Sequence, residues 1–165
     1  MRRCCYCVFT IMMFSAWLHA ASSVAASYQY TEEEIQKGPP ILRTKTIAVD
    51  PGDNAIKKLQ KELFNEALVE LNKRYKLWVM AKGTTEQLVA CGDRMLTAGL
   101  GVNEKTEDRT AFLKLMLEFS SYVGQVVVNR DNLKNPDQQV DRHLVAEFHL
   151  SVLILLEKEK KAGVK

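Results

Sequence analysis

One pair of side chains has the spacing of metal ligands: His143 and Glu147 lie four residues apart. On a helix this spacing places an imidazole and a carboxylate on the same face, where both can reach one divalent cation. His149 lies about 240° around such a helix from His143, so it does not complete the site. Two ligands seldom form a specific site, and we therefore expect a surface pair, with no metal and no other cofactor.

Cys4, Cys5 and Cys7 form a cluster near the N-terminus, with C-x-x-C spacing between Cys4 and Cys7. This spacing is typical of zinc or redox sites, but no second ligand pair follows, and the cluster lies in a stretch that resembles a targeting signal. Without that stretch Cys91 is the only cysteine, so no disulfide can form within the chain. We expect Cys91 to be a small buried apolar residue, and a reactive thiol is the alternative.

Ser120 and Ser121 are candidate nucleophiles only if a base lies nearby, and the sequence around them contains none. The sequence also lacks a G-x-S-x-G motif, a phosphate-binding glycine loop and a zinc-protease helix motif. No role in an active site is filled, so we predict that the protein is not an enzyme and has no catalytic residues.

Residues 1–26 have the features of a secretory signal. Arg2 and Arg3 are followed by an apolar run from Val8 to Leu18 and by the small residues of Val24 to Ala26. These features predict a secreted or periplasmic protein whose mature chain begins at Ser27. The alternative is membrane anchoring through residues 4–26, because this stretch carries no charged side chain and is long enough to span a bilayer.

Removal of residues 1–26 from the 165-residue chain leaves 139 residues, which suits one domain with a single core. Arg2 and Arg3 are the only charges lost, so 21 basic residues face 20 acidic ones. This balance gives no electrostatic reason to bind nucleic acid. If the signal is cleaved, we expect no stable membrane span.

The rest of the chain has helical periodicity and helix caps. Apolar residues recur at three- and four-residue steps over four segments, and no segment alternates with a period of two. Asp53 or Asn54, then Thr84, Thr106 and Asn135 are the expected N-caps. Gly99-Leu100-Gly101 is expected to end the second helix. We predict an all-α fold in which antiparallel helical hairpins form a four-helix, up-down bundle over residues 55–162, with hairpins at 55–101 and 106–160 and an irregular N-terminal arm at 27–54 that lies on the bundle.

The run from Arg74 to Ala90, whose turn reads Ala81-Lys82-Gly83-Thr84-Thr85-Glu86-Gln87, resembles the helix-turn-helix consensus of TolC-type outer-membrane efflux proteins. The segment from Arg142 to Leu156 is similar to the same pattern. The resemblance implies an exported helical-hairpin module. It does not imply a pore, because the chain has no segments that match the membrane strands of those proteins.

The last predicted helix is apolar around most of its circumference, so more than one of its faces needs cover. We assign Val140, Leu144, Phe148, Ile154 and Leu155 to the bundle. The predicted association surface is the other face, which comprises Val145, Leu150, Val152, Leu153 and Leu156. Its cover would be a second copy or an envelope protein, unless the helix lies centrally with residues 41–49 on its back. The predicted function is an exported, non-catalytic interaction or structural module of the cell envelope, and the alternative is a small-molecule or lipid carrier with an apolar pocket between helices.

Overall fold

The computed structural model describes residues 37–130 and 137–163, which fold into helices without any strand. The prediction of an all-α fold is therefore confirmed. A short 3-10 helix, η1, precedes the long helices. The element bounds are η1 Pro40–Arg43, α2 Ala55–Val79, α3 Thr85–Val102, α4 Thr106–Arg130 and α5 Asp137–Ala162.

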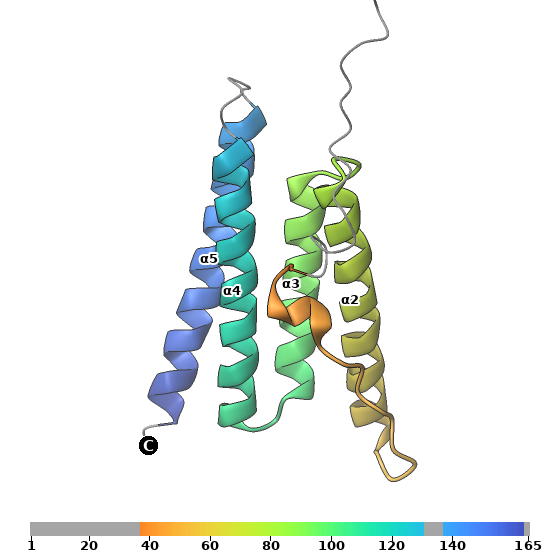
Figure 1. Cartoon of the computed structure of the whole chain (residues 1–165). Coiled ribbons are helices and arrows are strands. Elements are labelled where there is room, and N and C mark those ends of the chain that lie inside the picture. The colour runs from red at the N-terminus through yellow and green to blue at the C-terminus, as the bar shows by residue number, and fades with distance from the viewer. Residues whose placement is uncertain (1–36, 131–136, 164–165) are drawn as a thin grey trace, which may run out of the picture.

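The helices form two pairs, α2 with α3 and α4 with α5, and α3 joins the pairs by contacting both α4 and α5 (Figure 1). In Figure 1 the chain reverses direction at each connection between successive helices. Because α2 packs mainly on α3, it lies at the edge of the arrangement and α3 lies inside it. Side chains of α3 therefore form much of the contact between the pairs.

Two predicted caps are present in the structure. The Asn54 side chain accepts a hydrogen bond from the Lys57 backbone N–H (2.8 Å), and the Thr84 hydroxyl accepts one from the Gln87 N–H (3.2 Å). Each cap satisfies a backbone donor that the first turn of a helix leaves without a partner. Asn135, the cap expected for α5, lies outside the described residues.

The expected break at Gly99-Leu100-Gly101 is wrong, because α3 continues to Val102. No glycine in the described part of the chain has a positive φ angle. Gly99 instead gives room to the Phe112 ring of α4, and Gly92 gives room to the Phe148 ring of α5. These glycines are therefore packing sites at which a helix of the second pair approaches α3 closely.

The core is rich in aromatic side chains. Phe64 and Phe112 meet edge to face with ring centroids 6.3 Å apart, and Phe119 and Phe148 do the same at 6.3 Å. Such pairs favour edge-to-face geometry because of the charge distribution of the rings. The Phe64–Phe112 pair joins α2 to α4, and these two helices belong to different helix pairs.

A buried polar chain also connects the two pairs. The Trp78 indole N–H donates to the Thr85 hydroxyl (3.1 Å), and this hydroxyl donates to the Asp141 carboxylate (2.7 Å). The Arg130 guanidinium lies 4.3 Å from the centre of the Trp78 ring. Since Trp78 and Thr85 are buried, these partners satisfy groups that would otherwise be costly to remove from water.

The described part of the arm, residues 37–54, lies on the bundle as predicted. Its helix η1 packs on α4 and α2, and Ile41 is completely buried there. The arm thus fills space beside α2 and α4. It does not provide the cover over α5 that we considered from the sequence.

One helix of the described chain, α4, is long and apolar enough to cross a membrane by length and composition alone. The core helix of a bundle meets the same criteria. In this structure α4 contributes Phe112, Leu113, Met116, Phe119 and Val123 to the core.

Candidate functional site

A hollow of about 720 Å³ lies along α2 and α3. We call it the α2–α3 hollow. The hollow forms because small residues occupy three positions between the two helices, where larger side chains would fill the space. These residues are Ala67 on α2 and Ala98 and Gly101 on α3. Its lining comprises Gln60, Leu63, Glu66, Ala67 and Glu70 of α2, with Asp93, Arg94, Thr97, Ala98 and Gly101 of α3.

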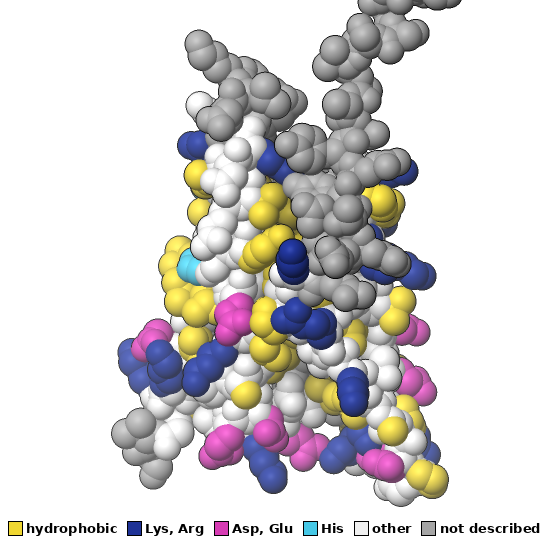
Figure 2. Space-filling view, viewed as in Figure 1, with side chains coloured by type: hydrophobic (Ala, Val, Ile, Leu, Met, Phe, Trp, Pro, Cys, Tyr) yellow, Lys and Arg dark blue, Asp and Glu magenta, His cyan; other side chains and the backbone are white. Residues whose placement is uncertain are grey.

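An exposed apolar stripe leads into this hollow. Ile56, Leu59 and Leu63 lie at three- and four-residue steps on α2 and are 71%, 55% and 49% exposed. We call these three residues the α2 stripe. Figure 2 shows hydrophobic side chains at the surface over the N-terminal half of α2. Single exposed apolar residues are ordinary, but contiguous exposed apolar surface marks a binding site in many proteins.

The polar rim of the hollow is mainly acidic. Arg94 is held by Glu70 in a two-point contact, with Nε–Oε2 and Nη2–Oε1 distances of 2.9 and 2.7 Å. This hydrogen bonding to Arg94 lowers the pKa of Glu70. Burial raises the pKa of Asp93, and the nearby Arg94 acts in the opposite direction. Because Glu70 neutralises Arg94, Glu66 and Asp93 leave the rim with a negative charge.

A second, smaller hollow of about 460 Å³ lies between α4 and α5. We call it the α4–α5 hollow. Its wall includes Gly124, Val127 and Val145, together with the side chains of Ser120 and His149. Most of its surface is apolar, and a Cβ atom at Gly124 would lie 3.5 Å from Val145, at an ordinary contact distance.

Ser120 and His149 contact each other across this hollow, with 2.9 Å between Oγ and Nδ1. The Ser120 hydroxyl also lies 2.9 Å from the Leu117 carbonyl oxygen. Because a hydroxyl has one proton, Ser120 donates either to Leu117 or to His149, and the tautomer of the imidazole decides which. Ser120 is buried, and its contact with Nδ1 holds the His149 ring in place.

Sequence reasoning missed the contact between Ser120 and His149, which are 29 positions apart on different helices. Their approach depends on the register of α4 against α5, which no local pattern reports.

The pair with metal-ligand spacing, which we expected to be a surface pair, lies at the surface. His143 Nε2 and Glu147 Oε1 are 3.1 Å apart and both side chains are exposed. Within the described residues, no group of three or more His, Cys, Asp or Glu side chains could hold a metal ion. Cys91 is buried, and burial raises the pKa of its thiol.

The predicted association surface needs correction. Val145, Val152 and Leu156 are buried in the core, where they and Phe148 form the inner face of α5. Leu150 is 56% exposed and Leu153 is half-buried, so only these two of the five remain at the surface. The sequence could not separate the faces, because a helix that is apolar nearly all round gives little directional signal.

Two residues that we assigned to the bundle are exposed instead, namely Val140 and Ile154, the latter by 48%. Leu150, Leu153 and Ile154 thus form the outward apolar face of α5, which we call the α5 stripe. Lys158 and Lys161 follow it and line a shallow hollow with Leu153 and Ile154.

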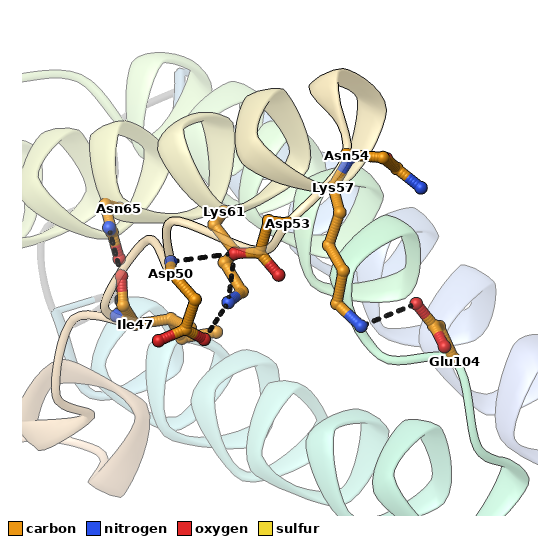
Figure 3. A network of polar contacts seen from close by, with 8 residues as sticks. All are labelled: Ile47, Asp50, Asp53, Asn54, Lys57, Lys61, Asn65 and Glu104. Carbon is orange, nitrogen blue, oxygen red and sulfur yellow. Dashed lines mark hydrogen bonds and ion pairs between the residues drawn. The ribbon is translucent and has the colours of Figure 1, made fainter.

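A polar network near the start of α2 positions the arm (Figure 3). Lys61 is only 7% exposed, and its ammonium group lies 2.6 Å from Asp53 and 3.0 Å from Asp50. Hydrogen bonding to Asp53 and then to Asp50 raises the pKa of Lys61, and hydrogen bonding to Lys61 lowers the pKa of Asp53. This network fixes the loop before α2.

Asn65 completes this network. Its amide group donates to the Ile47 carbonyl (2.9 Å), and its carbonyl oxygen accepts from the Ile47 N–H (2.8 Å). Figure 3 also shows Lys57 reaching Glu104 at 3.2 Å. The first contact holds the arm against α2, and the second connects the start of α2 to the segment after α3.

The chain matches no protein-family model, no curated protein and no solved structure. The resemblance of residues 74–90 to TolC-type proteins thus stays a prediction from the sequence. Function must be argued from the surfaces described above.

Proposed function

We propose that this protein is an exported, non-catalytic interaction module that binds another protein surface through the α2 stripe and the α2–α3 hollow. The observation that carries the proposal is the exposure of Ile56, Leu59 and Leu63 beside a hollow with an apolar floor. Complete burial of a side chain of this size contributes about 1.5–3 kcal/mol. A partner that covers the stripe would gain much of this free energy.

The non-catalytic part of the proposal is supported by the chemistry of the described side chains. The closest arrangement to a nucleophile and base is Ser120 with His149, and there the hydroxyl is buried and also lies within hydrogen-bonding distance of the Leu117 carbonyl. Export is supported by the composition of residues 1–26, which lie outside the described residues.

Site-specific photo-crosslinking in the producing cell tests this function. A photoreactive amino acid at Leu59 should give a covalent adduct with a protein, because this position lies on the exposed stripe. The matched control places the same amino acid at Lys114, an exposed position on α4. Absence of an adduct at Leu59, or equal yields at both positions, would contradict the proposal. Intact-mass analysis of the same protein reports whether the mature chain begins at Ser27.

The α4–α5 hollow favours a second candidate function, a carrier of small amphiphilic molecules. Its apolar wall suits a short hydrocarbon chain, and His149 and Arg142 add polar groups at the same hollow. Native mass spectrometry of protein purified from its own cell should then show a bound small molecule. Ala146→Trp, which fills this hollow from an exposed position, should remove that molecule. A ligand-free mass for the unaltered protein would contradict the carrier function.

A further inference from the structure

We propose that the partner bound by the α2–α3 hollow is a second copy of this chain, which inserts its α5 stripe. This inference rests on the proposed function and names the partner of the same site. The α5 stripe is the other outward apolar helix face of the described structure, with Leu150 and Ile154 about half exposed. Figure 2 shows hydrophobic side chains at the surface over α5, away from the exposed side chains of α2.

The α5 stripe fits within the length of the hollow. Residues 60–70 of α2, which line the hollow, span about 15 Å. The stripe from Leu150 to Ile154 spans about 6 Å, or about 16 Å when Lys158 and Lys161 are included, at 1.5 Å per residue. The seam at Ala67, Ala98 and Gly101 offers space for the branched side chains of Leu150 and Ile154. An amphipathic helix in an apolar groove is a common mode of recognition, with anchors at three- and four-residue steps.

The two surfaces also have complementary charges. Glu66 and Asp93 are exposed on the rim of the hollow, and Lys158 and Lys161 are exposed beside the α5 stripe. Within the described residues none of these four forms an ion pair, whereas Glu70 is paired with Arg94 and Glu157 with Lys160. A second copy thus presents an apolar helix face flanked by lysines to an apolar groove flanked by carboxylates.

Because the hollow and the α5 stripe are different surfaces, the contact joins the copies head to tail. Each bound copy keeps one unused hollow or one unused stripe, so further copies can add unless the assembly closes into a ring. A symmetric dimer would instead use one surface twice. This difference makes the proposal testable by complementation.

The experiment uses two variants of the full chain that each disable one surface. Leu63→Lys adds a positive charge to the hollow, where it repels the lysines of an incoming helix. Ile154→Glu adds a negative charge to the stripe, where it is repelled by the acidic rim. Both positions are about half exposed, so each variant should keep the fold, and circular dichroism melting curves check this. Val140→Lys, at an exposed position of α5 outside the stripe, is the matched control.

Analytical ultracentrifugation should show that the unaltered protein and Val140→Lys form species larger than dimers as concentration rises. Leu63→Lys and Ile154→Glu should each be monomeric, and their equimolar mixture should form a dimer that grows no further, because its two remaining surfaces are the disabled ones. Higher salt should weaken every assembly, since the proposed contact includes solvent-exposed ion pairs, which salt screens.

Three results would overturn the inference: a monomeric unaltered protein at all concentrations, a mixture that stays monomeric, or self-association retained by either single variant. If the unaltered protein is monomeric but Leu59 crosslinks to a different protein, the proposed function stands and only this inference fails. If Leu59 gives no adduct at all, both fail.

Discussion

Replacement of Gly99 by alanine should destabilise the domain, although alanine is the better helix former. A Cβ atom at this position would overlap the Phe112 ring at Cζ and both Cε atoms. The ring cannot move away easily, because Phe112 is buried and packs edge to face on Phe64. Gly101, two residues further along the same helix, is the matched control, because a Cβ there meets nothing within 4 Å.

The size of the effect follows from two opposing contributions. Alanine in place of glycine inside a helix contributes about 1 kcal/mol of stability. Overpacking of a buried site costs about 1–3 kcal/mol, and the overlap with three ring carbons places Gly99 near the upper end of that range. We therefore expect Gly99→Ala to lose about 2 kcal/mol and Gly101→Ala, near the end of its helix, to gain about 0.5 kcal/mol.

Thermal unfolding followed by circular dichroism measures the difference. For a domain of this size, 1 kcal/mol changes the melting temperature by roughly 4 °C, so the two variants should differ by on the order of 10 °C. Urea unfolding gives the same comparison as free energies of unfolding. Equal melting temperatures for the two variants, or a more stable Gly99→Ala, would show that Phe112 does not occupy the space beside Gly99.

Three further predictions concern Thr85, Asp53 and Cys91. Thr85→Val should reduce the free energy of unfolding in urea by about 1–3 kcal/mol, because the buried Trp78 indole N–H loses its acceptor; an unchanged value would contradict the bond. The pKa of Asp53 is lower in the folded than in the unfolded protein, so its bond to Lys61 stabilises the fold above the ordinary carboxyl pKa of 3.8, and this contribution is lost as the pH falls through the folded pKa. Urea midpoints should thus fall more steeply on acidification for the unaltered protein than for Asp53→Asn, and parallel pH profiles would refute this. Cys91 should resist alkylation until urea unfolds the protein, because its thiol is buried and the pKa of that thiol is raised. Peptide mapping after a timed iodoacetamide pulse measures this, and labelling of Cys91 in the folded protein would contradict the prediction.

The helices and the starts of α2 and α3 could be predicted from the sequence because they depend on neighbouring residues, whereas Thr106, the cap expected for the next helix, is instead the first residue of α4. Asn54 and Thr84 are caps whose partners lie three positions away. Phe112, Met116 and Phe119 follow the helical period and are buried. In each case the interaction that decides the structure is local.

Features that depend on another helix could not be predicted. Gly99 belongs to a Gly-Leu-Gly sequence that is typical of a helix end, yet its role is set by the Phe112 ring of α4. The inner face of α5 was assigned wrongly because Val145 and Val152 are as apolar as the exposed Leu150 and Ile154. Only the position of α5 against α3 and α4 distinguishes these residues, and this position is not encoded by the periodicity of α5.

Hollows and charged rims depend on such contacts even more strongly. Glu66 and Asp93 belong to different helices, and they face one hollow because α2 and α3 pack side by side. Sequence patterns identified neither the hollow nor the buried Lys61. The periodicity of α2 alone also did not predict that Ile56, Leu59 and Leu63 would remain outside the core.

The burial of Ile41 has a consequence for how far the chain can be shortened from its N-terminus. Gly38, Pro39 and Ile41 are buried against the bundle, so they belong to the folding unit even though they precede the first long helix by more than a dozen residues. Cleavage at Ser27 would leave eleven residues in front of Gly38 and keep this part of the core intact. A recombinant fragment that begins at Ala55, the start of α2, would contain every long helix and still lack a core side chain.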